Sequence, residues 1–217
     1  MSRAGVSFTL SYAQNQLEEA ANWLHQVLRI AHDWRQAYLL AQGEIGSMRL
    51  ALARGELSAA HQALLRIEAL LEQEEFPHYV PHEEYVLWKM VSHVEYWLAS
   101  RNLTQAQAWA TQHLLSAQAW DFMHNAEMLM LVQVLLAVPQ YSQAVDLLSQ
   151  FREPLSELGD IQTTIHYLAL SVVALSHAGR REEARHSASV YIDRARGLHP
   201  RVSGCWPPHE AGTQDAA

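Results

Sequence analysis

Apolar residues recur along most of this chain with the spacing of an amphipathic helix. Between Leu17 and Ala31 they fall at intervals of three and four positions, which places them on one helical face. Comparable patterns predict further helices over residues 34–54, 58–74, 82–100, 104–118, 123–138, 142–152, 161–178 and 181–196. We therefore predict an all-α fold.

Helix breakers and capping residues separate these segments. Gly55 and Gly179 mark turns, and the two prolines within residues 75–81 exclude a helix there. We expect Asp33 and Asp160 to cap the helices that follow them, and Pro154 to kink or end its helix.

One alanine returns in the same local setting every 38 to 46 residues. The five positions are Ala20, Ala60, Ala106, Ala144 and Ala184. A period of about 40 residues with one small residue per unit is typical of stacked helical hairpins. Two helices approach closely only where no large side chain separates them, so we expect each alanine to lie at a helix crossing. The predicted architecture is a right-handed superhelix of antiparallel helical hairpins of the tetratricopeptide repeat (TPR) type.

The repeats make one elongated domain over residues 1–196, which we expect to begin within a repeat. Residues 197–217 are rich in Pro, Gly, Ser and Thr without periodicity, and we expect them to be disordered. Because solenoids usually need polar capping repeats and none is evident, we interpret the chain as a fragment, a truncated gene product or one segment of a larger assembly.

Charge and cysteine content exclude several classes of function. The net charge is −8 and the basic residues form no cluster beyond Arg180 and Arg181, so we expect no nucleic acid contact. The single cysteine, Cys205, forms no intrachain disulfide, which favours a cytoplasmic protein. The longest apolar stretch, residues 128–138, is too short to span a membrane.

Catalysis and metal binding have little support in the sequence. There is no G-x-S-x-G motif, and paired acids such as Glu182 and Glu183 are typical of solvated helix ends. His78 and His82 have a spacing that suits zinc on a helix, but Pro81 falls between them. We expect a protein that is not an enzyme and carries no metal or other cofactor.

Three successive stretches resemble a known family. They are residues 49–73 (RLALARGELSAAHQALLRIEALLEQ), residues 94–151 and residues 163–195. Together, over residues 14–196, they are similar to the TPR-like sensor domain of the large ATP-binding LuxR-type transcriptional activators, the maltotriose-responsive activator family. The resemblance implies a superhelical sensor domain between a nucleotide-binding module and a DNA-binding helix-turn-helix. This chain has no phosphate-binding G-x-x-x-x-G-K-[ST] motif and no helix-turn-helix after residue 196, so neither activity is assigned to it.

A ligand in such a solenoid lies on the concave face, which the first helix of each hairpin lines. Counting back from each alanine with TPR spacing places polar and aromatic candidates there, within one residue of register: Gln42, Arg49, Trp88, Glu95, Gln133 and His166. Their hydrogen-bonding groups and the indole ring suit a sugar-like molecule. The alternative is that Arg49 and Glu95 are solvated or paired on an exposed face.

Two functions remain open from the sequence. The first is an effector-sensing or protein-interaction segment of a LuxR-type regulator, binding a small molecule or a regulatory protein. The second is a separate TPR-like scaffold that binds a partner peptide in its groove. Exposed apolar surface at uncapped ends would favour self-association in either case.

Overall fold

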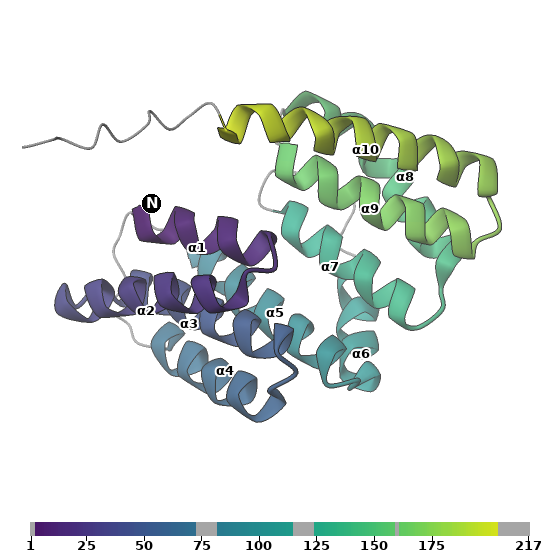
Figure 1. Ribbon diagram of the computed structural model, residues 1–217. Helices are drawn as coiled ribbons and strands as arrows, with labels where there is room; N and C mark the ends of the chain where they lie inside the picture. The colour runs from purple at the N-terminus through teal and green to yellow at the C-terminus, as the bar shows by residue number, and fades with distance from the viewer. Residues whose placement is uncertain (1–2, 73–81, 115–123, 159–160, 204–217) are drawn as a thin grey trace, which may run out of the picture. The chain divides into compact units, whose positions relative to one another are not determined.

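The computed structural model describes residues 3–72, 82–114, 124–158 and 161–203, with side chains over 7–72, 84–114, 125–151 and 163–193 (Figure 1). All regular structure in these ranges is helical. The helices are α1 (Arg3–Ala13), α2 (Leu17–Asp33), α3 (Ala37–Ala53), α4 (Leu57–Leu71), α5 (His82–Ala99), α6 (Leu103–His113), α7 (His124–Ala137), α8 (Tyr141–Leu158), α9 (Ile161–His177) and α10 (Arg181–Ser203).

The chain divides into two compact units, residues 1–138 and 139–217. In the first, α1 packs on α2, α3 on α4 and α5 on α6, with α2 against α3, α4 against α5 and α7 against both α5 and α6. In the second, α9 packs against both α8 and α10. These are the stacked helical hairpins that the repeat predicted. We expected residues 123–138 to pair with residues 142–152. These two segments belong to different units, so their pairing stays a prediction.

The five recurring alanines confirm the interpretation of the repeat. Each is the fourth residue of its helix, in α2, α4, α6, α8 and α10. The first four are fully buried and Ala184 is 6% exposed. In the core between α3 and α4, Ala60 and Ala63 pack with Met48, Leu64 and Ile67. A larger side chain at Ala60 would therefore have to displace the helix that faces it.

One turn geometry leads into most of the second helices. Gly55 at φ +75° and Gly179 at φ +78° adopt the left-handed conformation that glycine tolerates best. The amide of the next residue closes each turn, from Glu56 to the carbonyl of Ala51 and from Arg180 to that of Leu175. Three residues therefore reverse the chain, which sets the paired helices side by side in opposite directions (Figure 1).

Helix α1 is absent from the sequence prediction, which places no helix before Leu17. Its Phe8 and Tyr12 lie one turn apart with ring centroids 5.8 Å from each other, and both pack on the core of Ala20, Leu24 and Leu50. Its segment alternates small polar residues with apolar ones and has only these two large aromatic side chains on its inner face. Periodicity alone therefore gave a weak signal.

Three predicted helix boundaries were wrong. Asp33 is the last residue of α2 rather than the cap of α3. Helix α3 begins at Ala37, and Gln36 at its N-cap position makes no side-chain capping hydrogen bond. As a result Trp34 lies in the turn with its side chain 69% exposed. Helix α8 continues past Pro154 to Leu158, so the proline does not end it, and the alternative of a kink there stays a prediction. The last helix ends at Ser203 rather than at Arg196. Asp160, the expected cap of the helix that follows it, lies outside the described residues. The domain limit at residue 196 stays a prediction.

Candidate functional site

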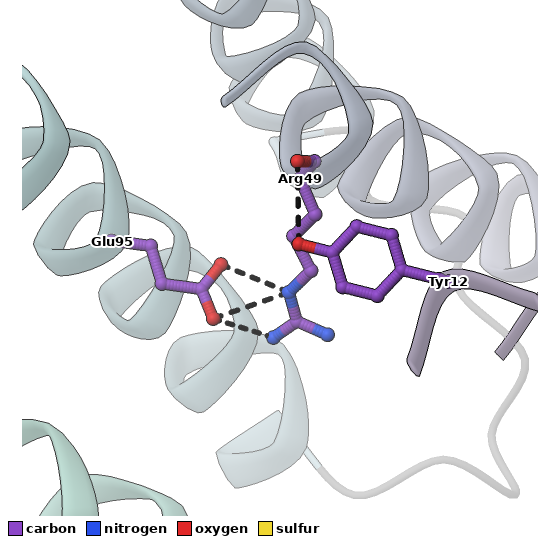
Figure 2. Close-up of polar contacts among 3 residues, drawn as sticks. All are labelled: Tyr12, Arg49 and Glu95. Atoms are coloured by element: carbon purple, nitrogen blue, oxygen red, sulfur yellow. Dashed lines mark hydrogen bonds and ion pairs between the residues drawn. The ribbon is translucent and has the colours of Figure 1, made fainter. Parts of the chain in front are cut away.

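The first helices of three hairpins bring polar side chains together in the first unit. Arg49 of α3 and Glu95 of α5 form an ion pair, with Nε donating to Oε2 at 2.9 Å and Nη2 to Oε1 at 2.8 Å (Figure 2). From α1, the hydroxyl of Tyr12 donates a long hydrogen bond of 3.4 Å to the carbonyl oxygen of Arg49. We call Tyr12, Arg49 and Glu95 the polar cluster.

The polar cluster is partly open to solvent. The side chain of Arg49 is 41% exposed and that of Glu95 is 18% exposed. Glu95 occupies Nε and Nη2 of the guanidinium, while Nη1 has no hydrogen-bond partner among the described residues (Figure 2). A planar guanidinium presents its donors in a fixed fork, so Nη1 stays available to a ligand while Glu95 holds the group in place.

The charges in the cluster change two pKa values. Burial on its own would lower the pKa of Arg49, but the charge and hydrogen bonds of Glu95 outweigh burial, and the pKa is raised. Burial raises the pKa of Tyr12, with the Arg49 charge acting against this shift and the Glu95 charge adding to it. Arg49 is therefore a permanent cation, and Tyr12 is a neutral hydroxyl throughout the physiological range.

An aromatic group lies two helical turns away from the polar cluster on the same two helices. Trp88 of α5 packs against Tyr38 of α3, with ring centroids 5.0 Å apart, and meets Tyr85 edge-on at 6.0 Å. The amide of Gln42 donates to the Tyr38 hydroxyl at 3.0 Å. Because seven residues make two turns, Gln42 and Arg49 share a face of α3. Trp88 and Glu95 share a face of α5 in the same way. The two helices therefore meet through an aromatic contact and, two turns further along, through an ionic contact.

Ser92 lies between these two contacts on α5. It is 1% exposed, and its hydroxyl oxygen has no hydrogen-bond partner among the described residues. Its spacing of four from Trp88 and three from Glu95 places it on their face of the helix. A buried hydroxyl of this kind is normally satisfied by water or by a bound molecule.

The structure joins four of the six predicted candidates in one region. Arg49 pairs with Glu95, and Gln42 and Trp88 both contact Tyr38. Gln133 is partly buried on α7, and within the described residues no hydrogen bond or ion pair links it to the polar cluster. His166 is exposed on α9 in the second unit, so its place relative to the other five stays a prediction.

Sequence reasoning missed the three tyrosines of this region. Tyr38 precedes Gln42 by one turn, so the same spacing rule extended toward the start of α3 would have found it. Tyr85 precedes Trp88 by three positions in the same manner. Tyr12 gave no such signal, because its helix was not predicted.

Two findings on the described residues concern metal ligands and membrane-spanning helices. Within them, no three His, Cys, Asp or Glu side chains gather into a set of metal ligands. His78, a member of the histidine pair weighed above, lies outside the described residues. Across the same ranges, no helix is both long and apolar enough to cross a membrane.

Comparison with known proteins identifies the repeat. The family described as the MalT-like TPR region matches residues 7–188, well over half of the chain. No curated protein and no solved structure matches the chain. The matched range takes in the polar cluster, the aromatic group and all five buried alanines. The chain therefore belongs to the MalT-like TPR region family.

Proposed function

We propose that this chain is the effector-sensing segment of a bacterial LuxR-type transcriptional regulator, and that the joint face of α3 and α5 binds a small polar effector. The observation that carries the proposal is the Arg49–Glu95 ion pair, which fixes a partly exposed guanidinium two helical turns from an aromatic group on the same two helices. The family to which the chain belongs supports a regulatory role.

The chemistry of this face suits an uncharged ligand with several hydroxyl groups, such as a sugar. Nη1 of Arg49 offers a donor that is held in place, and the Glu95 carboxylate offers acceptor lone pairs beyond those that Arg49 uses. The indole of Trp88 supplies an apolar face against which a sugar ring packs. The preformed ion pair means that little side-chain freedom is lost when the ligand binds.

Binding of an effector changes a regulator only if its two states differ in affinity for the effector. The polar cluster joins α1, α3 and α5, which belong to three successive hairpins. A ligand that contacts Arg49 and Glu95 would favour the arrangement of hairpins in which both residues reach it. This dependence on hairpin stacking links binding to regulation.

A thermal-shift screen with sugars and small metabolites tests the proposal. A ligand that binds only the folded state raises the free energy of unfolding by about 2.7 kcal/mol at a hundredfold excess over its Kd. We expect one chemical class to raise the midpoint in a dose-dependent way, and the Arg49→Ala variant to lose that shift.

Arg54→Ala is the matched control, because Arg54 also pairs with a glutamate, Glu18 of α2 at 2.7 Å, but lies at the C-terminal end of α3 outside the polar cluster. This variant should keep the ligand-induced shift. A ligand that shifts the Arg49→Ala variant as much as the wild type would contradict the proposed site. A flat screen with a cooperatively folded protein would favour the scaffold that binds a partner peptide.

A further inference from the structure

The second unit contains a groove that none of the predicted site residues lines. It has a volume of about 670 Å³ and lies among α8, α9 and the start of α10. Its lining comes from residues that are far apart in the sequence, from Val145 on α8 to Val190 on α10. Its volume falls within the usual range for small-molecule sites.

The floor of this groove is apolar. Val145 and Leu148 of α8 are almost fully buried, at 4% and 3% exposure, and line it together with Leu168 and Leu175 of α9. Apolar walls of this kind favour a ligand with a hydrocarbon or aromatic body, because burying that body removes apolar surface from water.

Three hydroxyl groups that line the groove donate their hydrogens to backbone carbonyls. Ser149 donates to Val145 O at 2.8 Å, and Ser171 donates to Tyr167 O at 2.8 Å. Tyr167 in turn donates to Leu148 O at 3.0 Å. A hydroxyl whose hydrogen is committed offers only oxygen lone pairs to its surroundings. At these three positions the groove therefore offers hydrogen-bond acceptors.

The charged residues of the lining also favour a positive ligand. Arg180 lines the groove, but its Nε and Nη2 both bind Glu183 at 2.6 Å, so this carboxylate offsets its charge. Glu182 adds a second carboxylate to the lining. Arg185, which is not a lining residue, pairs with its Oε1, and the remaining lone pairs of this carboxylate can accept from a ligand. These two acids also occupy the first turn of α10, where the helix dipole would otherwise attract an anion.

We propose that this groove binds a small amphipathic cation, an ammonium group on a hydrocarbon or aromatic body. The body packs on the floor formed by α8 and α9, and the ammonium donates to hydroxyl oxygens and to the Glu182 carboxylate. This site is separate from the face of α3 and α5, and it lies in the other unit. Either proposal can therefore fail without the other.

The test uses three probes of similar size and different charge: 2-phenylethylammonium, 2-phenylethanol and 3-phenylpropanoate. The full chain labelled with ¹⁵N is titrated with each probe, and amide chemical shifts give both the Kd and the position of binding. We expect saturable shifts on α8, α9 and α10, with the ammonium binding most tightly and the carboxylate least tightly.

Two substitutions at neighbouring positions of α10 separate groove binding from general effects. Ser187→Phe places a ring inside the groove, and we expect the Kd for the ammonium to rise about tenfold or more. Ser189 is exposed and does not line the groove, so Ser189→Phe should leave the Kd within about twofold. Circular dichroism checks that both variants are folded.

A third variant tests the charge without filling the groove. Glu182 is exposed, so Glu182→Gln should not disturb folding. It should raise the Kd for 2-phenylethylammonium by about two- to fivefold and leave the Kd for 2-phenylethanol unchanged. Three results would each overturn the proposal: no saturable shift on these helices, tighter binding of the carboxylate than of the ammonium, or equal affinity for all three probes.

Discussion

Arg49 on α3 and Glu95 on α5, which are 46 positions apart in the sequence, form an ion pair with two points of contact. Both helices are the first members of their hairpins, and the pair is one of the contacts between the second hairpin and the third, beside the packing of α4 on α5. The pair thus contributes to the stacking of hairpins and also forms the polar part of the proposed effector site.

A double-mutant cycle measures how strongly the two side chains are coupled. We expect Arg49→Met and Glu95→Gln each to destabilise the protein, because each leaves a partly buried charged or polar group without its partner. The double variant should be less destabilised than the sum, with a coupling free energy of about 1 kcal/mol, as is usual for a pair that is partly exposed. Urea unfolding gives all four free energies. Strict additivity would contradict a specific contact between the two residues.

The raised pKa of Tyr12 predicts a loss of stability in alkaline solution. The folded protein holds the Tyr12 proton more tightly than the unfolded chain does. The contribution to stability is therefore fully present below the unfolded pKa of about 10, and it is lost as pH rises through the folded pKa.

Tyr12→Phe tests this pH dependence. The variant should be less sensitive to pH than the wild type above about pH 10, because the titrating hydroxyl is gone. Urea unfolding at neutral pH and at several alkaline pH values measures the difference. The prediction fails if the two proteins lose stability in parallel.

The buried alanines predict a sharp difference between neighbouring positions of α4. Ala60 is fully buried, whereas Ala59 is exposed. Ala60→Leu should destabilise the protein by about 1–3 kcal/mol, because the added side chain has no space at the crossing of α3 and α4. Ala59→Leu should change stability by less than about 0.5 kcal/mol. Similar midpoints for the two variants in thermal unfolding would show that the alanine does not mark a close crossing.

The turns predict opposite effects at two equivalent positions. Gly55 and Arg101 both adopt left-handed conformations before a second helix, at φ +75° and φ +58°. Gly55→Ala should destabilise by about 1 kcal/mol, because a Cβ is disfavoured there. Arg101→Gly should be stabilising by up to about 1 kcal/mol for the same reason. Thermal unfolding measures both, and a destabilised Arg101→Gly variant would mean that its side chain contributes more than the strain costs.

The hairpin repeat was predictable because its signal is local. The alanine and the turn before it lie within a few residues of each other, and helical spacing gives the face on which each side chain falls. That reasoning placed Arg49 and Glu95 on the same kind of face. Their contact depends on how α3 packs laterally on α5, which no local pattern describes.

The remaining features escaped prediction for similar physical reasons. Helix α1 has few large apolar residues, so its periodicity is weak. Its position is fixed by the packing of Phe8 and Tyr12 on the core around Leu24. The turn at Trp34 has no glycine to mark it in the sequence. Arg35 adopts there the left-handed conformation that Gly55 adopts in the next turn. The groove of the second unit comes from the spacing between three helices, so its lining has no sequence signature.

Binding of an effector to the face of α3 and α5 can be observed directly. Its most direct test is a ¹H–¹⁵N titration of the full chain with the ligand that gives the largest thermal shift, following the side-chain signals of the Trp88 indole and the Arg49 guanidinium. We expect saturable changes at both signals, and loss of the change at the Trp88 indole in the Arg49→Ala variant but not in Arg54→Ala. Saturable binding that leaves both signals unmoved would contradict the proposed site.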